Sequence, residues 1–332
     1  MSIRNPFPSR RDLLRSTALT GLAALSSSAF GELAADLDGN GMPYAAFDRM
    51  KAESIAVGDA RILVAFGPGA FTASREDIMG YVRQSARSVA AYFGRFPAQT
   101  TKLLILSSAS PGRPVRSGTT FGYGGAAIKL TLSANASPAE LARDWILVHE
   151  MCHIAMPSLP RRQHWFEEGM ASYVEPLARA QTDSLSPRRV WADFVQGMPQ
   201  GLPKSGDRGL DFTPTWGRTY WGGALFCLLA DVRTREATHN TRGLQHALRG
   251  MLRHGNIEQD SAIEPLLQQG DLETGVPVLQ TLYSQMKDAP YPVDLDRLWA
   301  SLGIRAVADG VEFDYAAPLA SVRAAMTRPT AA

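Results

Sequence analysis

Cysteine is scarce in this 332-residue sequence, which contains only Cys152 and Cys227. Two cysteines allow at most one disulfide, and this excludes a small scaffold held together by disulfides. Both lie in apolar stretches with helical spacing, where a free cysteine is typically a small buried side chain, and whether the two pair stays open. An excess of charge of one sign is also lacking, because 34 basic and 32 acidic residues leave a formal charge of +2. Without a run of lysine and arginine, we expect no nucleic-acid partner.

Long hydrophobic runs and internal repeats are missing as well. No stretch of the main body reaches the ~18 uncharged apolar residues that a membrane helix needs. No fixed period indicates a solenoid or a propeller. The composition, with 45% hydrophobic and 20% charged residues, is typical of a globular protein. Its length suits one large two-lobed domain or two small ones.

The N-terminus differs from the rest of the chain. Residues 1–31 have a basic front, a short apolar stretch and then small residues, which is the layout of an export signal. Within them, SRRDLLR resembles the twin-arginine export motif, with Leu13 where phenylalanine is usual and Arg15 in place of lysine. The resemblance implies an exported protein, periplasmic or secreted. Once the signal is cleaved, after Ala29 or Gly31, we expect no stable membrane insertion.

The remaining sequence predicts an α+β fold in two lobes. Residues 32–180 are expected to form an N-terminal lobe with a sheet and the metal-binding helices, and residues 181–332 a mostly helical C-terminal lobe. Short apolar runs that end in turn residues predict strands, whereas apolar residues three and four apart behind a capping signal predict helices. The expected strands are 60–67, 101–109 and one or two within 118–133, and the expected helices include 74–94 and a buried one between 137 and 157.

The stretch LVHEMCHIAM in that buried helix is the strongest candidate for a functional site. Residues four apart share one face of a helix, so His149 and His153 can present both imidazoles to one metal ion. Glu150 lies beside them and is turned so that it can reach a water at the metal without binding the metal itself. The pattern therefore predicts a catalytic zinc ion with Glu150 as the general base.

A catalytic zinc ion usually has three protein ligands and one open position, so a third ligand is needed. In the metzincin pattern it would be a histidine at position 159, but that residue is Leu159. The downstream segment WFEEGMASYVE supplies a carboxylate instead, and it resembles the second zinc-binding helix of the gluzincin peptidases. The match places the role of third ligand on Glu168, in the Glu–Gly pair of that segment.

Alternatives to Glu168 stay open. His164 and Glu167 are also within reach by sequence. Glu175, two turns further along the same helix face, is expected either to orient a ligating histidine or to be a surface carboxylate.

Two more segments extend the resemblance to the gluzincins. In RTYWGGALFCLLADV, Tyr220 precedes a glycine that opens an apolar helix, where these peptidases have a tyrosine that stabilises the oxyanion; the alternative is a tyrosine that only packs at a helix start. The segment FGYGGAAIKL lies where they place the strand that pairs with the substrate, or it is a plain hairpin. Exopeptidases of the group carry a glutamate at the end of that strand. Residues 124–127 are glycine and alanine here, which favours an endopeptidase.

The resemblance thus implies a compact gluzincin with a thermolysin-like catalytic domain, exported and dependent on one Zn²⁺ ion. His149, His153 and Glu168 would bind the metal, and Glu150 and Tyr220 would act on a peptide or protein substrate through a metal-activated water. A catalytically inactive zinc-binding scaffold, an aminopeptidase and another zinc amide hydrolase are the alternatives. The oligomeric state is not predicted.

Overall fold

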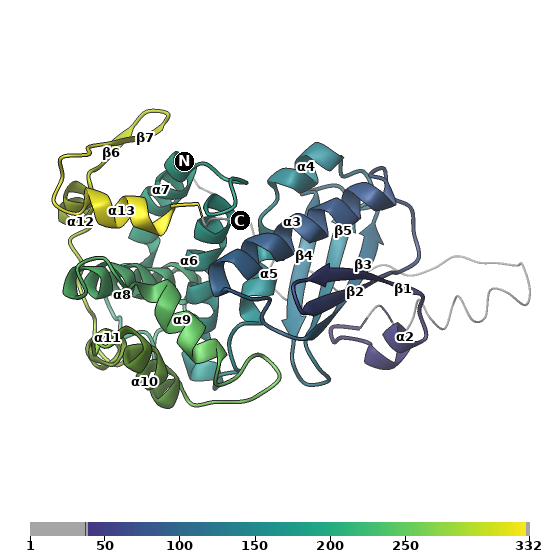
Figure 1. Cartoon of the computed structure of the whole chain (residues 1–332), viewed down its shortest axis with the longest axis horizontal. Coiled ribbons are helices and arrows are strands. Elements are labelled where there is room, and N and C mark those ends of the chain that lie inside the picture. The colour runs from purple at the N-terminus through teal and green to yellow at the C-terminus, as the bar shows by residue number, and fades with distance from the viewer. Residues whose placement is uncertain (1–36, 38, 330–332) are drawn as a thin grey trace, which may run out of the picture.

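A five-stranded mixed sheet forms one half of the molecule. The computed structural model describes residues 37 and 39–329, and Figure 1 shows the sheet on the right. The strands lie in the order β1-β2-β3-β5-β4, with β2, β3 and β5 parallel and each outer strand antiparallel to its neighbour. β4 is therefore an edge strand. The strands are β1 (Ala52–Val57), β2 (Ala60–Phe66), β3 (Thr100–Ser108), β4 (Val115–Phe121) and β5 (Ala127–Ser133).

Alternation along the central strands gives the sheet two apolar faces. Leu103 and Ile105 of β3 are buried in the main core, to which the long helix α3 (Arg75–Phe93) also contributes. The intervening Leu104 points to the other face and belongs to a smaller cluster with the short helix α2 (Tyr44–Asp48). Successive side chains of a strand point to opposite faces, so the uninterrupted apolar run at the centre of this strand, residues 103–106, serves both faces.

Several predicted elements are confirmed. Helix α3 begins after Ser74, whose side chain accepts from the backbone N of Asp77 while the Asp77 carboxylate accepts from the backbone N of Ser74, and it ends at Gly94 with φ of 78°. Strands β2 and β3 match their predicted ranges within one residue, and 118–133 contains parts of two strands. Strand β1 was not predicted, because only Ile55 of it is buried and no apolar alternation results.

The prediction of a single buried helix between residues 137 and 157 is wrong. The chain forms α4 (Pro138–Arg143) and then α5 (Ile146–His153), separated by Asp144 in an extended conformation with ψ of 149°. A capping box at Ser137 is present at the start of α4. The Asp144 carboxylate accepts from the backbone N of Ile146 at 2.8 Å and thereby satisfies the start of the second helix.

The other half of the molecule is mostly helical, as expected for the later part of the chain. Figure 1 shows these helices on the left, and α6 packs against both α5 and α8. A two-stranded hairpin near the C-terminus was not predicted. The elements are η1 (Arg161–Gln163), α6 (His164–Ala180), α7 (Pro187–Gly197), η2 (Met198–Gly201), η3 (Arg218–Gly222), α8 (Gly223–Ala237), α9 (Leu244–Leu252), α10 (Ile263–Thr274), α11 (Val278–Met286), α12 (Leu295–Leu302), β6 (Ile304–Val307), β7 (Gly310–Phe313) and α13 (Ala320–Met326).

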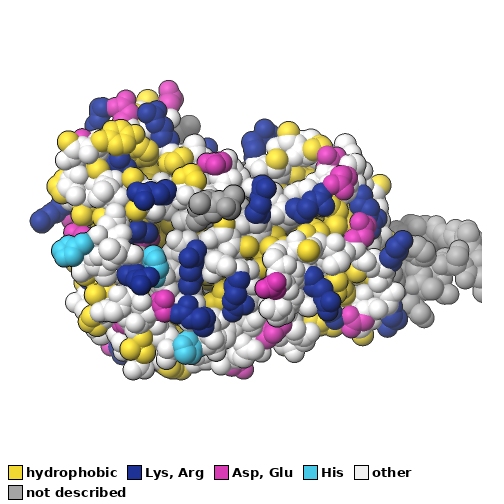
Figure 2. All heavy atoms as spheres, viewed as in Figure 1, with side chains coloured by type: hydrophobic (Ala, Val, Ile, Leu, Met, Phe, Trp, Pro, Cys, Tyr) yellow, Lys and Arg dark blue, Asp and Glu magenta, His cyan; other side chains and the backbone are white. Residues whose placement is uncertain are grey.

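The remaining predictions concern the two cysteines, membrane spans, charge and the export signal. Cys152 and Cys227 are both buried free thiols, so they do not pair. None of the helices in the part of the chain that the structure describes is long and apolar enough to span a membrane. Acidic and basic side chains are scattered over both halves on the face shown in Figure 2. The predicted export signal lies outside the described residues, and the division of the lobes after residue 180 stays a prediction.

Candidate metal centre

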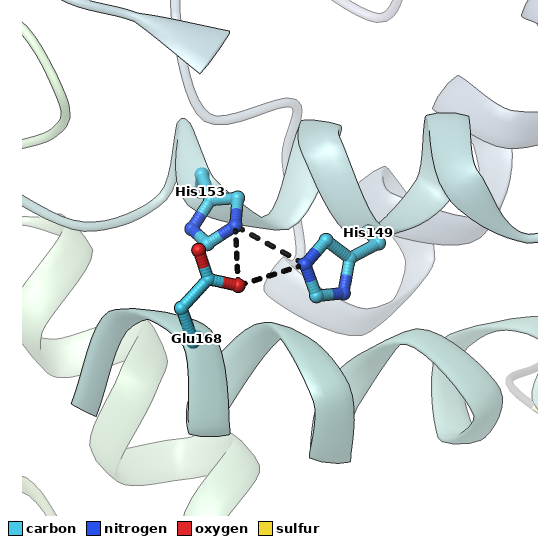
Figure 3. A group of neighbouring side chains, drawn as sticks. All are labelled: His149, His153 and Glu168. Atoms are coloured by element: carbon cyan, nitrogen blue, oxygen red, sulfur yellow. Dashed lines mark hydrogen bonds and ion pairs between the residues drawn. The ribbon is translucent and has the colours of Figure 1, made fainter. Parts of the chain in front are cut away.

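Both histidines of the sequence motif lie on the same side of α5. Their Nε2 atoms are 3.3 Å apart, and Figure 3 shows the two rings turned toward one another. The ring of His149 is buried and has the edge of Trp145 on it, with centroids 5.4 Å apart. The four-residue spacing on a helix therefore brings the two rings together as predicted.

Glu168 reaches the two histidines from the neighbouring helix α6. Its Oε2 lies 3.2 Å from Nε2 of His149 and 3.6 Å from Nε2 of His153 (Figure 3). The three side chains form a group whose ligand atoms all lie within 4.8 Å of one another. The structure thus brings together the three residues that the sequence predicts as metal ligands.

This group fits a zinc ion. Four ligands arranged tetrahedrally at Zn–N and Zn–O distances of ~2.0–2.1 Å lie ~3.3–3.4 Å from one another. The three separations here are 3.2, 3.3 and 3.6 Å, close to that value. Two imidazole nitrogens and one carboxylate oxygen are also a donor set typical of catalytic zinc, with a fourth position left for water or substrate.

Opposite charges stabilise the group when no metal is bound. Burial alone would raise the pKa of Glu168, but the imidazoles of His153 and His149 lower it far below its ordinary range. Burial lowers the pKa of His153, yet the Glu168 carboxylate outweighs this and raises it to about 9. The pKa values of the two groups are thus shifted in opposite directions, as is expected for a histidine and a carboxylate in contact.

The alternative ligands take other roles. Glu167 accepts a hydrogen bond from the backbone N of Leu159 at 2.9 Å through Oε1, so it ties down the connection between α5 and α6. His164 lies 3.3 Å from Oε1 of Glu168, whereas the two histidines of α5 lie nearest to Oε2. Neither Glu167 nor His164 belongs to the group of three ligand atoms.

Glu150 lies against the edge strand β4. Its Oε2 is 2.7 Å from Oγ1 of Thr120, and its backbone O is 2.8 Å from the same hydroxyl. A methyl group on Gly118 would lie 2.5 Å from Cγ of Glu150, so only glycine leaves room for this side chain. Sequence reasoning missed both contacts, because nothing in the local pattern of β4 indicates a partner on α5.

Tyr220 lies beside the metal group on a π-helical turn, η3. Its ring stacks on that of His149, with centroids 6.5 Å apart and 20° between the planes. Burial, followed by the charges of Glu168 and Glu150, raises the pKa of Tyr220 above its ordinary value. The hydroxyl therefore keeps its proton at neutral pH and can donate it in a hydrogen bond. Short π-helical segments are frequent at functional sites.

Two glycines bring Tyr220 and Glu168 close together. A methyl group on Gly169 of α6 would collide with Cα of Gly223, and one on Gly223 would collide with the backbone O of Trp165. Helices α6 and α8 therefore touch through their backbones at this point. The glycine after Glu168 and the glycine after η3, both part of the sequence motifs, are required by this close approach.

A buried carboxylate anchors the start of α6. Asp211 accepts hydrogen bonds from Nε1 of Trp165 at 2.8 Å, Nε2 of Gln163 at 2.9 Å and the hydroxyl of Tyr283 at 2.9 Å. The loop before η3 is thereby joined to the helix that carries Glu168. No motif marks Asp211, and its partners are distant in sequence, so sequence reasoning did not find it.

Both expectations for Glu175 are wrong. The side chain is buried rather than on the surface, and its Oε1 pairs with Nη1 of Arg179 at 2.8 Å. Nδ1 of His149 has no hydrogen-bond partner among the described residues, so Glu175 does not orient that ring. The carboxylate instead neutralises a buried arginine one turn further along α6.

Comparison with known proteins identifies a solved structure with a similar fold. No family model matches the chain, and a search of curated proteins finds no match. Among solved structures, an aminopeptidase N family protein from Idiomarina loihiensis matches with a TM-score of 0.56 and 14% identity, over 77% of this chain and 49% of that one. An M1 zinc metallopeptidase from Deinococcus radiodurans matches at 18% identity, over 74% and 54%, but its TM-score of 0.44 is too low to carry an argument.

The likeness to the Idiomarina protein establishes a shared fold. The chain is an α+β protein that resembles an aminopeptidase N family structure, and it spans about half the length of that protein. An identity of 14% says nothing about substrate or activity. The side chains of the candidate metal centre are therefore the basis for a function.

Proposed function

We propose that this chain is a zinc-dependent peptidase. The observation that carries the proposal is the group of ligand atoms from His149, His153 and Glu168, spaced at 3.2–3.6 Å as a tetrahedral zinc ion requires. Glu150 follows His149 in the chain and the Tyr220 ring stacks on His149, and the shared fold with an aminopeptidase N family protein supports the same interpretation. Zinc, when bound, supplies Lewis acidity that acidifies a water molecule and polarises a carbonyl oxygen.

The protein side chains supply the remaining parts of a hydrolysis. Glu150 accepts a proton from the attacking water and later delivers it to the departing amine nitrogen, so that the C–N bond breaks and a carboxylic acid and an amine form. Thr120 holds the Glu150 carboxylate in place through its hydroxyl. The protonated Tyr220 hydroxyl donates to the oxygen on which negative charge develops.

The type of cleavage is the finer part of the proposal. We favour an endopeptidase, because residues 124–127 provide no carboxylate to bind a free amino terminus. The alternative is an aminopeptidase, which the name of the similar Idiomarina structure suggests. Peptides or proteins are the proposed substrates in either case.

One experiment tests both the peptidase activity and the type of cleavage. Peptides with free and with blocked N-termini are incubated with the wild-type protein and with Glu150→Gln. We expect cleavage of both sets by the zinc-loaded wild type, and loss of cleavage with zinc retained in Glu150→Gln. If only free N-termini are cleaved, the protein is an aminopeptidase. If neither set is cleaved although zinc is bound, the protein is a zinc-binding scaffold and the proposed function is wrong.

Export is a separate part of the proposal and depends on SRRDLLR near the N-terminus. Replacing both Arg10 and Arg11 with lysine should keep the protein in the cytoplasm if the twin-arginine pathway carries it, because that pathway depends on the arginine pair. Cell fractionation measures the outcome. Unchanged export of the double variant would contradict this route.

A further inference from the structure

His164, the first residue of α6, has a carboxylate on each of its two ring nitrogens. Nδ1 lies 2.9 Å from Oε2 of Glu167, and Nε2 lies 3.3 Å from Oε1 of Glu168. The three residues occupy positions i, i+3 and i+4 of the helix, which share one face. His164 therefore contacts the predicted third ligand through Oε1, whereas His149 and His153 lie nearest to Oε2.

The two oxygens of Glu168 have different surroundings. Oε2 lies 3.2 Å from Nε2 of His149 and 3.6 Å from that of His153, whereas Oε1 lies beside His164. A carboxylate that rotates can bind a metal ion through both oxygens and so fill the position that a substrate needs. A contact to Oε1 opposes this rotation.

Glu167 fixes the orientation of the His164 ring. Its Oε2 binds Nδ1 of His164, while its Oε1 accepts from the backbone N of Leu159 at 2.9 Å. The ring is thus attached to the backbone of the connection between α5 and α6.

We propose that His164 is a positioning residue that holds Glu168 as a single-oxygen ligand and keeps the fourth position of the metal open. This inference rests on the proposed zinc centre and adds a residue that none of the sequence motifs contains. The side chain of His164 is 52% exposed, so replacing it disturbs no packed core. Partners of metal ligands of this kind typically contribute ~10–100-fold to metal affinity.

The proposal can be tested by metal binding alone, without any substrate. The variants are His164→Ala, His164→Gln and His164→Asn. Zinc affinity is measured by competition with a chelator, and the visible spectrum of the Co²⁺-loaded protein reports the number of ligands. We expect His164→Ala to bind zinc ~10–100-fold more weakly, because the Glu168 carboxylate is no longer held in place. Its Co²⁺ absorption should also be weaker, because a second oxygen of Glu168 joins the metal. Glutamine places its amide near Nε2 and should restore both values toward wild type. Asparagine places its amide near Nδ1, so it should behave as alanine does.

His254→Ala is the matched control, because that histidine lies on the connection between α9 and α10 and is exposed. It should leave zinc affinity and the Co²⁺ spectrum unchanged. The proposal is wrong if His164→Ala keeps wild-type affinity and spectrum, or if its defect is not relieved by glutamine. Loss of affinity with a stronger or shifted spectrum would mean that His164 is itself a metal ligand, which also refutes it.

These outcomes are separate from those that test the proposed function. A wild-type protein that binds zinc with the expected spectrum but cleaves no peptide would refute the peptidase and leave the role of His164 intact. If the protein cleaves peptides but His164→Ala changes neither zinc affinity nor the Co²⁺ spectrum, the role of His164 is refuted and the peptidase is retained. Thermal unfolding of the variants, compared with wild type, shows that they are folded.

Discussion

Metal binding and the proposed reaction chemistry depend on two differently built regions. The metal ligands lie on α5 and α6, which follow each other in the chain and are joined by a short connection. The reaction groups depend on distant segments: Glu150 is held by β4, and Tyr220 comes from η3. The first region is local in sequence, and the second exists only after the sheet and the helical half have come together.

This difference predicts that the two regions can be separated by mutation. Changes to the three proposed metal ligands on α5 and α6 should alter metal affinity and activity together. Changes on β4 and η3 should lower activity while the metal remains bound. Each prediction below is therefore checked with two measurements, zinc content or affinity and the rate of peptide hydrolysis.

The largest effect is expected from removing a metal ligand. Glu168→Ala should lose zinc during dialysis and reduce hydrolysis to background, because two histidines alone do not hold catalytic zinc. Treating the wild type with a chelator should have the same effect, and added zinc should restore activity. Glu76→Ala, at an exposed position on α3, is the control and should change neither value. Full activity of Glu168→Ala would contradict the assigned ligand.

Removing the Tyr220 hydroxyl should have the next largest effect. We expect Tyr220→Phe to lower kcat by ~10²–10³-fold, as is measured when one oxyanion donor is removed. The phenyl ring keeps the stacking on His149, so zinc affinity should not change. If kcat is unchanged, the tyrosine only packs at the helix start, and the second region loses one of its two reaction groups.

Gly118→Ala tests the contact between β4 and the general base. The added methyl group has no room beside Cγ of Glu150 and should displace that side chain. A displaced catalytic group can lower the rate by up to ~100-fold, and the zinc ligands should keep their metal. Gly80→Ala on α3 is the matched control, since nothing lies within 4 Å of the new methyl group. A rate equal to that of the control would contradict the close contact.

The smallest effect is expected at Thr120. Thr120→Val removes the hydroxyl that lies 2.7 Å from Oε2 of Glu150 but keeps the shape of the side chain. Loss of one hydrogen bond to a charged group should lower kcat/KM by about tenfold. The neighbouring Thr119→Val is the control, because that hydroxyl binds the backbone O of Gly118 instead. Equal rates for the two variants would show that Thr120 does not support Glu150.

Local signals predicted a large part of the fold. The capping serine at position 74 and the glycine at position 94 predicted the ends of α3, and the apolar runs predicted β2 and β3. The break at Asp144 was missed, because the apolar spacing continues through it and only the contacts of its carboxylate reveal the interruption. Strand β1 was missed because its side chains are mostly exposed.

The candidate site was also predicted only in part. The spacing of His149 and His153 and the Glu–Gly pair at Glu168 were sufficient to name the group that the structure assembles. The partners of these residues were not found. No sequence motif marks the supporting residues Thr120, Asp211 and Arg179, the last of which pairs with Glu175. A buried hydrogen bond requires only that two polar atoms meet, whatever the sequence around them.

The sequence by itself determined which side chains meet in the candidate metal centre, because helical spacing and a short connection fix the relative positions of neighbouring residues. Only the tertiary structure decided how those side chains are supported. The glycine contact between α6 and α8 brings Tyr220 to Glu168, and the edge of the sheet holds Glu150. These contacts join segments far apart in the chain, and their geometry depends on how whole helices and strands pack rather than on any local pattern.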